Sequence, residues 1–173
     1  MKTDFITELD ATATKLLEVL KAFTAEEFKQ IPFPGSWSAA QVAEHLLKSA
    51  SGIPAVLSGK SKPAERDPEE KVKIIESIFL DFNTKMKSPG SILPSDDPPG
   101  KQELLQSLNA TFEKIKQVSN RINLADQFTD FPFPQMGELT GYEWLCFLIS
   151  HSKRHTLQIK NIYDKVSGSV IVP

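Results

Sequence analysis

Residues 140–159 read TGYEWLCFLISHSKRHTLQI, and this stretch predicts a long helix near the end of the chain. Thr140 is a good N-cap, and Glu143 three residues later completes a capping box. Apolar residues then continue at helical spacing, so the helix is predicted to run to about Val166, ahead of Gly168. His151 and His155 lie four residues apart and therefore project from one face, one turn from each other.

Four further segments show helical spacing of apolar residues, which predicts helices over about 4–22, 38–51, 67–82 and 101–121. Ser38 and Gln41 form a second capping box, and Asp67 followed by proline and two glutamates is another helix start. A short helical turn is predicted at residues 24–27. Residues 83–100 hold four prolines and two glycines and are predicted to be a loop.

These segments predict an all-α fold, because no segment has a convincing strand pattern. Each long helix carries an apolar stripe that must be buried against a neighbour, which favours a helical bundle. The 173 residues fit a single domain spanning residues 1–173.

Composition narrows the functional classes. The net charge is −2 and the isoelectric point is near 5.9, so the chain lacks the basic field of a nucleic-acid-binding protein. No run of about 18 apolar residues predicts a membrane span, and the first residues lack the apolar core of a signal peptide. The single cysteine, Cys146, excludes an intrachain disulfide. A cytoplasmic protein is the expectation.

The chain has only three histidines, and their spacing predicts one metal site. His151 and His155 can reach one ion from a single helix face, and His45 would supply a third ligand from the helix over 38–51. All three can meet in the middle of the bundle if those two helices run antiparallel. Three protein ligands leave a coordination position open, as in catalytic zinc sites, where water or a thiol can bind. The alternative interpretation is an incidental histidine pair in a purely structural bundle.

The same residues carry a family resemblance. The segment 37–46, WSAAQVAEHL, and the segment 141–159, with its GYEWL start and H-x-x-x-H-x-x-Q-I pattern, resemble two motifs of the DinB-like superfamily. The resemblance spans nearly the whole chain in helix order. It implies a four-helix bundle with a long crossover between the second and third core helices, and the helix over 67–82 would be an addition within that crossover.

The resemblance also implies a function. The family's metal ligands fall on His45, His151 and His155, and the metals in such sites are typically nickel or zinc. Characterised relatives include S-transferases and isomerases that use low-molecular-weight thiols, while many members have no assigned activity. A homodimer is implied in the same way. We therefore expect a metal-dependent transferase or hydrolase acting on a small molecule; the alternative is a metal- or ligand-binding bundle without turnover, such as a sensor or an interaction protein.

No general base is evident near the histidines, because no carboxylate lies one turn from either histidine of the pair. Gln158 either hydrogen-bonds a ligand histidine or its water, or is simply exposed near the helix end. Glu44, next to His45, is expected to point into solvent. Cys146 lies about 140° around the helix from His151 and is expected to be a buried thiol and not a nucleophile.

Overall fold

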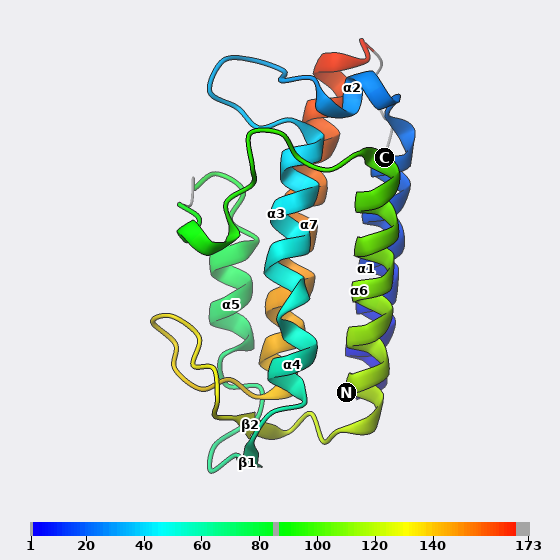
Figure 1. The fold of residues 1–173 in the computed structure, drawn as a ribbon. Coiled ribbons are helices and arrows are strands. Elements are labelled where there is room, and N and C mark those ends of the chain that lie inside the picture. The colour runs from blue at the N-terminus through cyan, green and yellow to red at the C-terminus, as the bar shows by residue number, and fades with distance from the viewer. Residues whose placement is uncertain (1, 85–86, 169–173) are drawn as a thin grey trace.

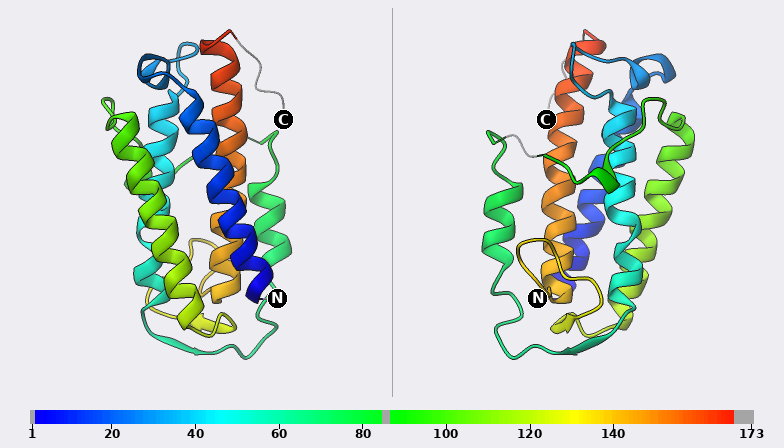
Figure 2. Two further views of the ribbon diagram at one scale, coloured as in Figure 1. Left: turned by 90° about the vertical axis from the view of Figure 1, so that its right-hand side faces the viewer. Right: turned by 60° about the vertical axis from the view of Figure 1, so that its left-hand side comes forward.

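Four long helices form the bundle in the computed structural model, which describes residues 2–84 and 87–168 (Figure 1). They are α1 (Lys2–Ala22), α3 (Ala39–Ser51), α6 (Lys101–Arg121) and α7 (Gly141–Val166). Helices α1 and α7 run in one direction and α3 and α6 run in the other, as the views of Figure 2 agree. Helices α3 and α7 are therefore antiparallel, which is the arrangement in which the three histidines were predicted to be able to meet in the middle of the bundle.

The predicted helix starts at Ser38 and Thr140 are confirmed. Each side chain accepts a hydrogen bond from the backbone N–H three residues on, and the Gln41 and Glu143 side chains accept from the cap residue's own N–H. The short helix α2 (Ala25–Lys29) begins in the same way, at Thr24. These bonds satisfy helix N–H groups that have no partner within the helix.

A long crossover, residues 52–100, links α3 to α6, as the family resemblance implies. It carries the short helix α4 (Ile53–Leu57), the strand β1 (Ser61–Pro63), the added helix α5 (Val72–Phe79) and the 3-10 turn η1 (Gly90–Ile92). Helix α5 packs against α7 outside the four-helix core (Figure 1). The rings of Phe79 and Phe147 lie 5.0 Å apart across this contact.

One prediction about the crossover was wrong. The helix expected over 67–82 is shorter, because residues 67–71 form turns in which the Asp67 carboxylate accepts from Glu69 N and the Lys71 N–H is donated to Glu143. The loop predicted over 83–100 is confirmed for its described residues, apart from the three-residue turn η1. The bundle also carries a small antiparallel pair of strands, β1 with β2 (Asp126–Phe128), and three residues each are too few to show an alternating pattern.

The core lies between the four long helices and consists mostly of apolar side chains. Its fully buried side chains include Leu16 and Leu20 of α1, Leu108 and Ile115 of α6, and Leu145 of α7. Helix α3 contributes buried alanines, which allow its neighbours to approach closely. Within the described residues, no helix is both long and apolar enough to cross a membrane.

Candidate metal centre

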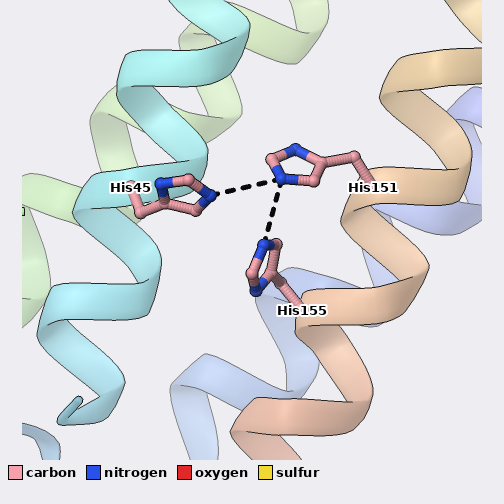
Figure 3. A group of neighbouring side chains, drawn as sticks. All are labelled: His45, His151 and His155. Carbon is pink, nitrogen blue, oxygen red and sulfur yellow. Dashed lines mark hydrogen bonds between the residues drawn. The ribbon is translucent and has the colours of Figure 1, made fainter. Parts of the chain in front are cut away.

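The three histidines meet between α3 and α7, although His45 and His151 are 106 residues apart in the chain (Figure 3). The Nε2 atom of His151 lies 3.2 Å from Nε2 of His45 and 3.0 Å from Nε2 of His155. Ligand atoms of all three residues lie within 4.8 Å of one another. The structure thus brings together every histidine that the sequence pattern selected.

These separations suit a metal ion. Two nitrogen ligands at zinc's bond length of 2.0–2.1 Å lie about 3.3 Å apart in a tetrahedral site, and about 2.9 Å apart at right angles. The two Nε2 separations, 3.2 and 3.0 Å, both lie within this interval. Three imidazole nitrogens are ligands that zinc, nickel, copper and iron accept.

Hydrogen bonds fix the direction of two of the rings. The carbonyl oxygen of Ile92 lies 2.8 Å from His45 Nδ1, and the amide oxygen of Gln158 lies 2.7 Å from His155 Nδ1. Both oxygens only accept, so each Nδ1 carries the proton and each Nε2 presents a lone pair to the centre. A proton on His151 Nε2 can form a hydrogen bond to only one of these two lone pairs. A metal cation, in contrast, could bind the Nε2 lone pairs of all three histidines.

The histidines are buried, with exposed fractions of 1% for His45, 6% for His151 and 8% for His155. Burial lowers the pKa of His155 to about 4, with a further lowering by the charge of His45. Burial also lowers the pKa of His45, and the pKa of His151 lies well below its usual range because of burial and its two histidine neighbours. All three rings are therefore neutral near pH 7, which is the form that binds metal.

Aromatic side chains enclose the rings. Phe147 stacks on His151 with centroids 5.3 Å apart and planes 15° apart, and Phe79 meets the same ring edge-on. Trp37 packs on His45 with centroids 5.2 Å apart. These contacts hold the imidazoles in place and keep bulk water away from them.

Sequence reasoning missed several of these neighbours. Ile92 acts through its backbone carbonyl, which no side-chain pattern reveals, and Phe79 comes from the added helix α5. Gln158 was left between two interpretations, and its bond to His155 supports the first of them. The position of Gln158 three residues after His155 was the one usable signal.

Glu44 corrects a prediction. It does not point into solvent but is 8% exposed, because residues of the crossover cover this side of α3. Its Oε2 accepts from the N–H and the hydroxyl of Ser95, and its Oε1 lies 2.9 Å from Lys48 Nζ. Within the described residues, no carboxylate or cysteine joins the three histidines, so a general base is still not evident.

Cys146, Lys153 and Arg154 of α7 make their contacts outside the group of three histidines. Cys146 is buried, its Sγ lies 3.8 Å from the Val72 carbonyl oxygen, and burial raises its pKa to about 12, so it is a structural thiol. Lys153 pairs with Glu8 of α1 at 2.5 Å. Arg154 donates to the Asp81 carbonyl oxygen and so ties α7 to the crossover.

Fold and site together define a class: four-helix bundles with a crossover between the second and third core helices and three histidines placed to bind a metal ion. The DinB superfamily model matches residues 8–159, and the chain belongs to this superfamily.

The chain is also similar to two proteins of Bacillus subtilis. It is 28% identical over 148 residues to the uncharacterized protein YuaE of Bacillus subtilis strain 168, covering 85% of this chain and 90% of YuaE. Its fold resembles that of YfiT from Bacillus subtilis with a TM-score of 0.60, at 18% identity, over 96% of this chain and 87% of YfiT. YfiT is described as a probable metal-dependent hydrolase with an unusual four-helix bundle topology.

Proposed function

We propose that this protein is a metal-dependent enzyme acting on a small molecule, with nickel or zinc bound by His45, His151 and His155. The observation that carries the proposal is the convergence of three neutral imidazoles on one point, with Nε2 separations of 3.0 and 3.2 Å. The description of YfiT as metal-dependent supports the same class. Three protein ligands are the number found in catalytic zinc sites, whereas structural sites have four.

The chemistry of such a site follows from its ligands. A divalent ion bound by three imidazoles supplies Lewis acidity and lowers the pKa of a water or thiol that binds it. Neighbouring residues orient the three rings for metal binding. Ile92 and Gln158 hold His45 and His155 in the tautomer that can bind a metal, and Phe147 stacks on His151. No step is assigned to a protein general base.

Among reaction types we favour transfer of a low-molecular-weight thiol over simple hydrolysis. A thiol that loses its proton on binding a cation is already a strong nucleophile and needs no carboxylate beside it. Hydrolysis by water usually benefits from a nearby general base, and none joins the three histidines in the described part of the chain. The printed description of YfiT keeps hydrolysis as the competing reaction type.

A second function is favoured by the burial of the centre. With at most 8% of any histidine exposed and three aromatic side chains around the rings, the site also suits a non-catalytic metal- or ligand-binding bundle, such as a sensor. Our proposal also retains the expectations of a cytoplasmic location, no nucleic-acid or membrane partner, and a homodimer.

The test begins with metal content by mass spectrometry on untagged protein, since a polyhistidine tag would bind the same metals. We expect about one equivalent of nickel or zinc in the wild type and in the control Lys153→Ala, whose side chain is exposed on the same helix, and none in His151→Ala. No metal in the wild type, even after incubation with excess nickel or zinc, would overturn the proposal. Turnover of thiol-acceptor substrates by loaded protein then separates the enzyme from the sensor.

A further inference from the structure

The last part of the crossover packs against α3 and contacts one histidine of the metal centre. After η1 the chain crosses α3 on its way to α6, as the right-hand view of Figure 2 shows. We call residues 92–95 the return segment. Its first residue, Ile92, provides the carbonyl oxygen that accepts from His45 Nδ1 at 2.8 Å.

Helix α3 holds the return segment at several points. Lys48 donates to the Leu93 carbonyl oxygen at 2.8 Å, and Gln41 donates to the Ser95 carbonyl oxygen at 3.2 Å. Glu44 Oε2 accepts from Ser95 N at 2.8 Å and from Ser95 Oγ at 2.9 Å. Pro94 has no N–H and a fixed φ, so little freedom remains between Ile92 and Ser95.

Among these residues of α3, Glu44 connects to both Ser95 and Lys48. One of its oxygens binds Ser95 and the other pairs with Lys48, which itself binds Leu93. Burial raises the pKa of Glu44, but the bonds from Lys48 and Ser95 outweigh burial and the net shift is downward. Glu44 is therefore a carboxylate near pH 7. A buried carboxylate with charge-assisted bonds at both oxygens is a strong anchor.

The three histidines differ in how their rings are directed. His155 is directed by Gln158 of its own helix, three residues away. His151 has a buried Nδ1 with no hydrogen-bond partner among the described residues, and is placed by ring stacking. Only His45 depends on a carbonyl 47 residues away in the chain. The proton therefore stays on His45 Nδ1 only while the return segment holds the Ile92 carbonyl oxygen beside it.

We infer that Glu44 is a positioning residue for the metal centre: by anchoring the return segment it holds the Ile92 carbonyl on His45 Nδ1, and so keeps His45 Nε2 unprotonated for the metal. The effect on metal affinity rests on the proposed function. The effect on the His45 tautomer applies to the metal-free protein as well.

The test compares Glu44→Ala, Glu44→Gln and the control Glu143→Gln, each checked for folding by circular dichroism. Glu143 is a second buried glutamate on a core helix that binds the crossover, but its partners are Arg66 and Lys71 and not the return segment. Zinc alone is titrated into metal-free protein. We expect Glu44→Ala to raise the dissociation constant for zinc about 10- to 100-fold, since outer partners of metal-binding histidines have effects of this size.

Glu44→Gln keeps an oxygen that can accept from Ser95, so we expect a smaller loss, and we expect Glu143→Gln to bind zinc like the wild type. Nitrogen-15 NMR of the histidine rings in metal-free protein provides the second measurement. His45 should carry its proton on Nδ1 in the wild type and in Glu143→Gln, and should become a mixture of tautomers in Glu44→Ala.

An unchanged His45 tautomer in Glu44→Ala would overturn the inference, and so would a changed tautomer with unchanged zinc affinity. If the wild type binds neither zinc nor nickel, the proposed function fails, and the tautomer measurement alone decides whether Glu44 positions His45. Should Glu44→Ala not fold, Glu44→Gln together with Ser95→Ala, which removes one of the two bonds to Oε2, provides the same comparison.

Discussion

Two buried glutamates tie the crossover to the core, and they do so at opposite ends of it. Glu143 of α7 receives two bonds from Arg66, at 2.6 and 2.7 Å, and one from the Lys71 N–H, while also capping its own helix at Thr140. Glu44 of α3 receives two bonds from Ser95 and pairs with Lys48.

The difference lies in what each anchored segment touches next. The residues held by Glu143 lead into α5, so this anchor fixes a helix against the bundle. The residues held by Glu44 lead back to Ile92 and thus to His45. The same side-chain chemistry therefore secures the fold at one end of the crossover and the metal centre at the other. The two ion pairs also differ in burial. The side chains of Arg66 and Glu143 are 18% and 0% exposed, whereas those of Lys48 and Glu44 are 37% and 10% exposed.

The largest effect on stability is expected from Glu143→Ala. It leaves the Arg66 charge partly buried without its partner and removes the acceptor for two backbone N–H groups. We expect the free energy of unfolding to fall by about 3–5 kcal/mol, the range for breaking a buried ion pair. Glu44→Ala should cost less, about 1–3 kcal/mol, the cost of leaving buried hydrogen-bonding groups unsatisfied. Urea denaturation of both variants measures the difference, and equal losses would contradict the comparison.

Cys146 offers a local probe of the same variant. Its buried thiol lies against the Val72 carbonyl, directly after the residue whose N–H binds Glu143. Wild-type protein should react slowly with a thiol reagent because the pKa of Cys146 is about 12 and the thiol is covered. The reaction should accelerate in Glu143→Ala more than in Glu44→Ala.

Local signals in the sequence were enough to predict most of the bundle. The capping boxes at Ser38 and Thr140 involve residues three apart, and the apolar stripes of the long helices need only helical spacing. The family resemblance supplied the order of the helices and the crossover. The antiparallel run of α3 and α7, which brings the histidines together, was a stated condition that the fold then met.

The errors share one physical cause, which is contact between segments far apart in the chain. Glu44 was expected in solvent because helical spacing turns it away from His45, but the crossover covers that side and binds it through Ser95. The helix start expected at Asp67 was lost because Glu143, 72 residues from Lys71, takes the Lys71 N–H. A loop with four prolines gives no pattern from which the Ile92 contact could be inferred.

Mild acid should lower the stability of the metal-free protein through the histidines of the metal centre. In metal-free protein the histidines have lowered pKa values, with His155 at about 4, while in the unfolded chain they take up protons near pH 6.5. Protons therefore favour the unfolded state as the pH falls from 6.5 toward 4. The pKa values of Glu44 and Glu143 are both lowered from the ordinary value of a glutamate by their hydrogen bonds, so both anchors stay ionised between pH 7 and pH 5.

We accordingly expect the free energy of unfolding to fall by about 2 kcal/mol between pH 7 and pH 5 from His155 alone. Urea denaturation of metal-free protein at the two pH values measures this loss. His155→Gln is the control, since it removes the titrating group and should lose less stability over the same interval. A wild-type stability that is the same at pH 7 and pH 5 would contradict the lowered pKa values.

The smallest effect is expected from Lys48→Met, which tests how much of the Glu44 anchor depends on its charged partner. Lys48 is more than one-third exposed, so solvent screens its pair with Glu44. Its removal also removes the bond to the Leu93 carbonyl oxygen, but the two bonds from Ser95 to Glu44 remain. We expect a loss of at most about 1 kcal/mol in urea denaturation, the range for exposed ion pairs. Arg66→Met, at the other end of the crossover, should cost several times more, because Glu143 would be left as a buried charge. If the two variants lost equal stability, the Glu44 anchor would depend on its ion pair as strongly as the Glu143 anchor does, and the return segment would be held by charge and not chiefly by the bonds from Ser95.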